Sequence, residues 1–147
     1  MSKGWEARRR EAQCVLDLAT VWARSDPTII AVGLAGSEAR GEARLDSDVD
    51  LVVLVQRPER WLDDDAWHVA FGDVRLVSAE TFGVLGERRL RLPSGLDIEV
   101  GIVPTSWAAI DPIDAGTQRV VGDGFRVLYE QDDSLSALIR SVDASRT

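Results

Sequence analysis

The chain has 147 residues, which fits one domain spanning 1–147 with a core of its own, and a formal net charge of −8 at pH 7. This charge argues against a protein that binds long nucleic acid, because such binding depends on clustered Lys and Arg side chains. The single cysteine, Cys14, excludes an internal disulfide. No run approaches the roughly 20 apolar residues of a membrane span, and the N-terminus lacks the apolar core of a secretory leader. We therefore expect a cytoplasmic protein.

The first half of the chain predicts two helices and two buried strands. Residues 5–24 carry apolar side chains at helical spacing, which predicts an amphipathic helix. The apolar run 29–35 predicts a buried strand, and residues 38–40 predict a short helix closed by glycine. A second apolar run predicts another buried strand over 49–55.

The second half alternates short helices with short strands. We expect, in chain order, a helix over 66–70 behind the acidic run 63–65, a strand over 74–77, a turn or short helix over 78–82, a hairpin of 88–92 with 96–103, a helix from Ser106 to Ile110, a helix over 118–121, a strand over 125–129 and a helix over 135–142. This alternation around a central hairpin predicts an α/β or α+β domain with a mixed β-sheet flanked by helices.

Two aspartates stand at the start of the second buried strand. Side chains alternate between the faces of a strand, so Asp48 and Asp50 point to one face while Val49 points to the other. Two such charges about 5 Å apart repel by about 3 kcal/mol at an effective dielectric near 20. A cation such as Mg²⁺ removes this repulsion, since it prefers one or two protein carboxylates together with substrate phosphates. The pair therefore indicates a metal site.

A Gly-Ser turn follows the first buried strand. Gly36 and Ser37 stand where a helix begins, and backbone N–H groups at a helix start attract phosphate that glycine allows to come close. Ser37 can cap the helix or contact the phosphate, and Arg40 can bind phosphate or pair with a neighbouring acid. A phosphate-binding turn beside a metal-binding strand is the minimum equipment for moving a nucleotidyl group.

These two segments carry a resemblance to a known superfamily. Residues 35–41, AGSEARG, and residues 47–51, SDVDL, resemble the nucleotidyltransferases that include polymerase beta, the aminoglycoside nucleotidyltransferases and the minimal nucleotidyltransferases. The resemblance covers residues 29–130 and implies a nucleotidyltransferase-like fold. It also implies that Gly36 and Ser37 receive the triphosphate of an NTP, and that the catalytic residues Asp48 and Asp50 bind Mg²⁺ or Mn²⁺.

A third carboxylate on a neighbouring strand completes the site in that superfamily. Asp97 and Glu99 lie two residues apart on one face of the predicted strand 96–103, so either can reach the metal. We prefer Glu99 as the catalytic and metal-binding residue, because the apolar run that follows it and ends near Pro104 resembles the third strand of the family. Asp97 stays open as a metal ligand, and the catalytic base is unassigned between Asp50 and the third carboxylate.

The resemblance implies a Mg²⁺-dependent enzyme that moves a nucleoside monophosphate from an NTP to a hydroxyl of a small-molecule or protein acceptor, releasing pyrophosphate. Two alternatives stay open. One is a partner-binding module similar to the minimal nucleotidyltransferase antitoxins, and the other is a domain that binds nucleotide without catalysis. The sequence identifies neither the nucleotide nor the acceptor, and it does not tell whether the active unit is a homodimer.

Two short basic clusters remain to be interpreted. The clusters are Arg8-Arg9-Arg10, which lies beside Glu6 and Glu11, and Arg88, Arg89 and Arg91, which lie beside Glu87. Short clusters of this kind favour solvated surface charge over a nucleic-acid groove.

Overall fold

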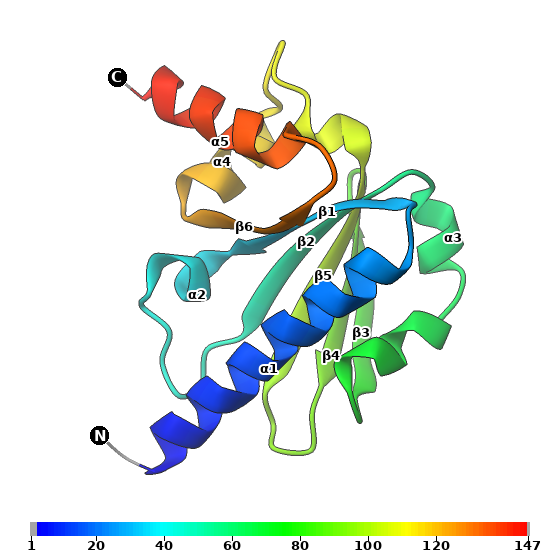
Figure 1. The fold of residues 1–147 in the computed structure, drawn as a ribbon, viewed down its shortest axis with the longest axis vertical. Coiled ribbons are helices and arrows are strands. Elements are labelled where there is room, and N and C mark those ends of the chain that lie inside the picture. Colours follow the sequence, from blue (N-terminus) through cyan, green and yellow to red (C-terminus); the bar gives the residue numbers. More distant parts are fainter. Residues whose placement is uncertain (1–2, 147) are drawn as a thin grey trace.

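A mixed six-stranded β-sheet organises the chain in the computed structural model, which describes residues 3–146 (Figure 1). The strand order is β3-β4-β5-β2-β1-β6. The β2 and β5 strands are parallel, whereas all other neighbours are antiparallel. The strands are β1 (Ile29–Ala35), β2 (Val49–Val55), β3 (Arg75–Phe82), β4 (Leu85–Arg91), β5 (Asp97–Pro104) and β6 (Phe125–Glu130). This sheet confirms the predicted fold class. The single domain was expected to span residues 1–147, and three of these, Met1, Ser2 and Thr147, lie outside the described residues.

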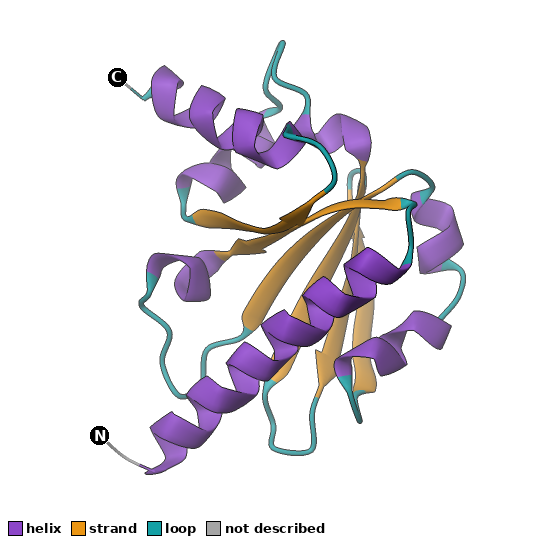
Figure 2. Ribbon diagram, in the orientation of Figure 1, coloured by secondary structure: helices purple, strands orange, loops and turns teal. Residues whose placement is uncertain are grey.

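Helices cover both faces of the sheet (Figure 2). They are α1 (Lys3–Ser25), α2 (Gly36–Arg40), α3 (Pro58–Leu62), the 3₁₀ helices η1 (Ala66–Phe71) and η2 (Thr105–Ala108), α4 (Ala115–Gly122) and α5 (Ser134–Ser145). One face packs against α1, α3 and η1, and the opposite face packs against η2, α4 and α5. Within the described chain, no helix combines the length and the apolar character that crossing a membrane requires.

The central strands are apolar on both faces because both faces are covered. In β2, Leu51 and Val53 belong to the core beneath α1, while Val52 and Leu54 belong to the core beneath α5. A strand buried on both sides is a near-continuous apolar run, which is why its limits could be predicted from the sequence. The β1 and β2 strands begin and end at the predicted residues.

Several segments differ from the prediction, including the three that follow. Residues 78–82 continue β3 and pair with β4, whereas a turn or short helix was expected there. The expected helix from Ser106 to Ile110 is the shorter 3₁₀ helix η2, which ends at Ala108 and is not capped by a side chain. Finally, the helix α3, which begins at Pro58, was not among the predicted elements.

Candidate active site

Three carboxylates meet at the start of the two parallel strands. Asp50 on β2 is the register partner of Glu99 on β5, and Asp48 lies just before β2. Each residue offers one carboxylate oxygen, and these oxygens all lie within 4.8 Å of one another. The parallel pairing of β2 with β5 therefore brings Glu99 to the aspartate pair.

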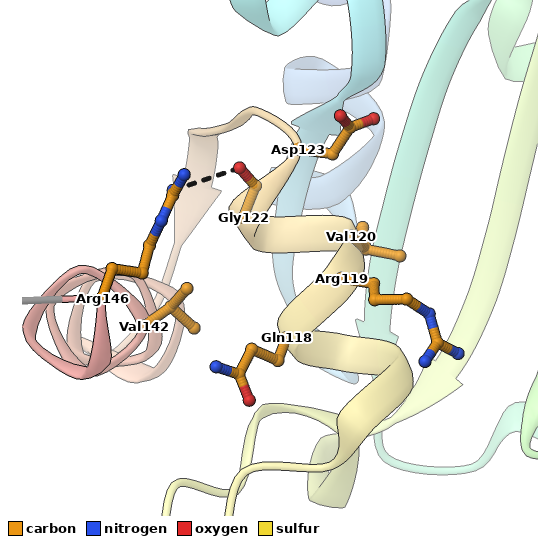
Figure 3. A pocket seen from close by; sticks show the side chains of 7 residues that line it. All are labelled: Gln118, Arg119, Val120, Gly122, Asp123, Val142 and Arg146. Atoms are coloured by element: carbon orange, nitrogen blue, oxygen red, sulfur yellow. Dashed lines mark hydrogen bonds between the residues drawn. The ribbon is translucent and has the colours of Figure 1, made fainter.

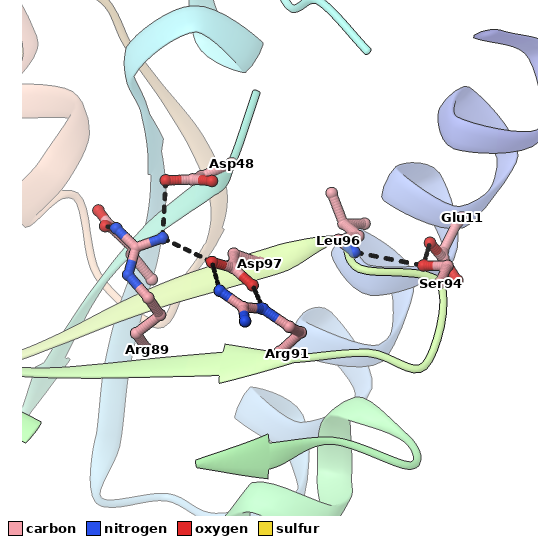
Figure 4. A network of polar contacts seen from close by, with 8 residues as sticks. Glu11, Asp48, Arg89, Arg91, Ser94, Leu96 and Asp97 are labelled. Atoms are coloured by element: carbon pink, nitrogen blue, oxygen red, sulfur yellow. Dashed lines mark hydrogen bonds and ion pairs between the residues drawn. The ribbon is translucent and has the colours of Figure 1, made fainter. Parts of the chain in front are cut away.

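Asp97, the other candidate for a third carboxylate, has different partners. Its carboxylate accepts hydrogen bonds from Arg91 Nε at 2.6 Å and from Arg91 Nη2 at 2.9 Å (Figure 4). A further hydrogen bond comes from Arg89 Nη1 at 2.8 Å. These bonds, above all those from Arg91, hold the pKa of Asp97 below its ordinary value although the side chain is buried. The structure thus places Asp97 among guanidinium groups and outside the group of three.

Asp50 is the carboxylate of the cluster whose negative charge is least offset by its neighbours. Burial, together with the charge of Asp48, raises the pKa of its carboxyl to about 6. Its Oδ1 atom is buried and accepts no hydrogen bond within the described chain. A buried carboxylate oxygen without a donor, beside two other carboxylates, fits a hard divalent cation such as Mg²⁺ or Mn²⁺.

The Gly-Ser turn lies directly against this cluster. Antiparallel pairing of β1 with β2 sets Ala35 opposite Asp50, so the turn at Gly36 begins beside the carboxylate. Gly36 has φ of 69°, and a Cβ atom added there would lie 2.6 Å from Asp50 Oδ2. Only glycine therefore fits this position without moving the carboxylate. Its N–H donates to the carbonyl oxygen of Gly124 at 3.2 Å, which joins the turn to the start of β6.

One hollow of about 470 Å³ joins the turn to the carboxylates. Its walls are Gly36, Ser37, Arg40, Arg44, Asp46, Ser47, Asp48, Asp50 and Asp123. Arg40 lines it while donating to the Asp123 carbonyl at 2.8 Å and to the Asp123 carboxylate at 3.2 Å. The sequence allowed two interpretations of Arg40, phosphate binding or pairing with an acid. In the structure Arg40 pairs with Asp123 and also lines the hollow.

A second, smaller hollow of about 230 Å³ shares Gly36, Asp50 and Asp123 with the first. It is lined by Asp50 and Glu99 together with Glu87 of β4 and apolar residues that include Leu85 and Val120. Burial raises the pKa of Glu87, and the nearby charges of Glu80, Asp50 and Asp48 act in the same direction. Sequence reasoning did not single out Glu87, which is brought to this hollow by the pairing of β4 with β5.

Arg89 is the principal site residue that sequence reasoning missed. Its guanidinium lies 3.0 Å from Asp48 Oδ2 (Figure 4). It also forms an ion pair with Glu99. Hydrogen bonds to Asp97 and Asp48 raise its pKa above the ordinary value. The expectation that this basic cluster is solvated was therefore wrong for Arg89. The signal was present, because the predicted hairpin sets Arg89 opposite Glu99.

The N-terminal basic cluster also contains a buried member. Arg8 on α1 is only 6% exposed and forms an ion pair with Glu38 on α2. Its Nη2 donates to the carbonyl oxygen of Ser47 at 2.8 Å. Solvated charge was thus a wrong expectation for Arg8, which connects α1 to the short helix behind the Gly-Ser turn and to the residue before Asp48.

A further hollow, of about 610 Å³, separates α4 from α5 (Figure 3). Its lining includes Arg119, Asp123 and Arg146, and Arg146 donates to the carbonyl oxygen of Gly122. Asp48, Asp50 and Glu99 do not line it. We therefore place the chemistry at the carboxylate cluster.

A known protein family matches the part of the chain that contains the Gly-Ser turn and the aspartate pair. The family model described as streptomycin adenylyltransferase matches residues 9–89, which is more than half of the chain and contains Gly36, Ser37, Asp48 and Asp50. No curated protein gives a significant match. The chain therefore belongs to the streptomycin adenylyltransferase family, a polymerase beta-like group, and is a nucleotidyltransferase.

Proposed function

We propose that the protein transfers a nucleoside monophosphate from an NTP to a hydroxyl of a small-molecule or protein acceptor and releases pyrophosphate. The observation that carries this proposal is the meeting of Asp48, Asp50 and Glu99 within 4.8 Å of one another. The hollow beside Asp48 and Asp50 also contains the Gly36–Ser37 turn. The description of the matching family names an adenylyl group, so we propose ATP as the donor.

Asp48, Asp50 and Glu99 would hold Mg²⁺ or Mn²⁺, and Gly36 and Ser37 would receive the triphosphate. When bound, the cation stabilises negative charge on the phosphate oxygens. Arg40 and Arg44 line the same hollow and contribute positive charge toward the phosphates.

In the transfer step, the acceptor hydroxyl oxygen forms a bond to the α-phosphorus. The bond from that phosphorus to pyrophosphate breaks, and the hydroxyl proton passes to a carboxylate of the cluster. We further propose that residues 1–147 act as one catalytic domain.

Calorimetric titration with ATP, GTP, CTP and UTP tests the site, with and without Mg²⁺. We expect Mg²⁺-dependent binding of ATP and its loss in the Asp48→Ala, Asp50→Ala double variant, because the variant lacks two of three ligands. Each single variant should fold and lose Mg²⁺-dependent transfer. Unaltered transfer in both single variants would refute the assignment, and no binding of any nucleotide by the wild type would favour the partner-binding alternative.

Gly36→Ala provides a test that leaves the carboxylates in place. The matched control is Gly41→Ala, since Gly41 has φ of 71° and a Cβ added there would meet nothing within 4 Å. Both variants should lose about 1–2 kcal/mol of stability from the left-handed backbone. Only Gly36→Ala should also lower transfer, by at least about tenfold, because its methyl group displaces Asp50. Equal transfer rates in the two variants would contradict the placement of Gly36.

A further inference from the structure

Arg89 contacts two of the three carboxylates proposed to hold the cation. Its Nη1 donates to Asp48 Oδ2 at 3.0 Å, and its Nη2 forms an ion pair with Glu99 Oε1. A cation ligated by Asp48 and Glu99 draws on lone pairs of the same two carboxylates. The guanidinium and the metal ion therefore compete for Asp48 and Glu99.

The position of Arg89 is set by its neighbours on the hairpin. In the register of β4 with β5, Arg89 stands opposite Glu99 and Arg91 stands opposite Asp97. Arg91 holds Asp97 with two hydrogen bonds, and Asp97 accepts a third from Arg89 Nη1 at 2.8 Å. Because Nη1 is shared between Asp97 and Asp48, the Arg89 guanidinium keeps an anionic partner if its contacts with Asp48 and Glu99 are lost.

The charges at this site support such an exchange. Three carboxylates within 4.8 Å repel one another unless a positive charge lies among them. Arg89 supplies one such charge, and its contacts reach Asp48 and Glu99 but leave Asp50 Oδ1 without a donor. Asp50 Oδ1 thus remains open to a cation while Arg89 holds the carboxylates of Asp48 and Glu99.

We propose that Arg89 is a positioning residue that acts as an internal counter-ion, holding Asp48 and Glu99 until a divalent cation displaces its guanidinium toward Asp97. This inference rests on the proposed function. Arg89 would then set the metal affinity of the site. Without the ion it keeps the carboxylates in place, and it makes the affinity for the ion lower than the three carboxylates alone would give.

Binding of Mn²⁺ to Arg89→Gln tests the proposal, measured by calorimetry without nucleotide. We expect this variant to bind Mn²⁺ at least about tenfold more tightly than the wild type, because a competing positive charge is gone. Its melting temperature in a chelating buffer should fall below that of the wild type, and saturating Mn²⁺ should raise that temperature more than it does in the wild type. A residue that merely supports the structure would weaken Mn²⁺ binding when replaced.

Arg88→Gln is the matched control. Arg88 neighbours Arg89 on β4, and Arg88→Gln changes the net charge by the same amount as Arg89→Gln. The Arg88 guanidinium donates to the carbonyl oxygens of Leu62 and Glu87. Its Mn²⁺ affinity should stay within about twofold of the wild type.

Equal or weaker Mn²⁺ binding by Arg89→Gln overturns the inference while the proposed function stands. Absence of Mn²⁺ binding in both the wild type and Arg89→Gln overturns the inference and the proposed metal site together. Should Arg89→Gln fail to fold, Arg89→Lys replaces it, since one ammonium group cannot reproduce the contacts of both guanidinium nitrogens. Tighter binding than in the wild type then supports the proposal, and equal or weaker binding overturns it.

Discussion

Asp50→Asn is expected to stabilise the protein in a chelating buffer above about pH 6 and to reduce nucleotidyl transfer by at least about a hundredfold. Stability should rise because burial and the charge of Asp48 raise the pKa of Asp50 to about 6 from an ordinary value of 3.8. The ionised carboxylate then lowers the free energy of unfolding by at most about 3 kcal/mol. Transfer should fall because asparagine is a weaker ligand for a divalent cation.

The sign of the pH dependence follows from the raised pKa. The folded protein binds this proton more tightly than the unfolded chain, so the contribution to stability is complete below about pH 4. It is lost as the pH rises through about 6, where the folded-state carboxyl ionises. The stability gained in Asp50→Asn should therefore be larger at about pH 7.5 than at about pH 4.5.

Urea unfolding in a chelating buffer at these two pH values measures the effect. Asp46→Asn is the control, because Asp46 is an exposed acid in the same hollow and its replacement changes the net charge equally. Saturating Mn²⁺ should stabilise the wild type more than the Asp50 variant. An Asp50 variant no more stable than the wild type at about pH 7.5, or one that retains transfer, would contradict this account.

Arg8→Met is expected to destabilise the protein by about 3–5 kcal/mol. The change leaves Glu38, whose side chain is 17% exposed, without its ion-pair partner. It also removes the donor to the Ser47 carbonyl oxygen and so loosens the segment that leads to Asp48. Transfer should fall along with stability, because Arg8 joins α1 to α2 and to that segment.

Equilibrium unfolding in urea measures this loss, with the exposed neighbour Arg9→Met as control. The control should change stability by no more than about 0.5 kcal/mol. In the double variant Arg8→Met, Glu38→Met, much of the stability should return, since replacing both partners of a buried ion pair by apolar groups leaves no unpaired charge. A single Arg8 variant as stable as Arg9→Met would show that the ion pair does not hold α2.

The fold illustrates where local pattern is sufficient. The limits of β1 and β2 agree with the prediction because strands covered on both faces need apolar side chains throughout. Residues 78–82 were mispredicted because most of their side chains are exposed and carry no alternation. They form a strand through hydrogen bonds to β4, on the far side of a tight turn at Gly83.

Within the site, alternation along β2 was enough to set Asp48 and Asp50 on one face, since this depends only on neighbours in the chain. The sequence likewise predicted the Gly36–Ser37 turn and the hairpin that carries Glu99. Alternation alone could not choose between Asp97 and Glu99, because both lie on one face of one strand, and Glu99 was preferred only from the resemblance to the third strand of the family. The register of β2 with β5 brings Glu99 to Asp50, and Asp97 is held by Arg91.

The sequence by itself thus determined the two central strands, the aspartate pair and the glycine turn, all of which depend on residues close together in the chain. Only the tertiary structure decided which charges are paired. Arg8 and Arg89 lie in clusters that look solvated, yet they contact Ser47 and Asp48, residues 39 and 41 positions away. Such contacts depend on strand register and helix packing, which bring distant charges together in a way that no local pattern records.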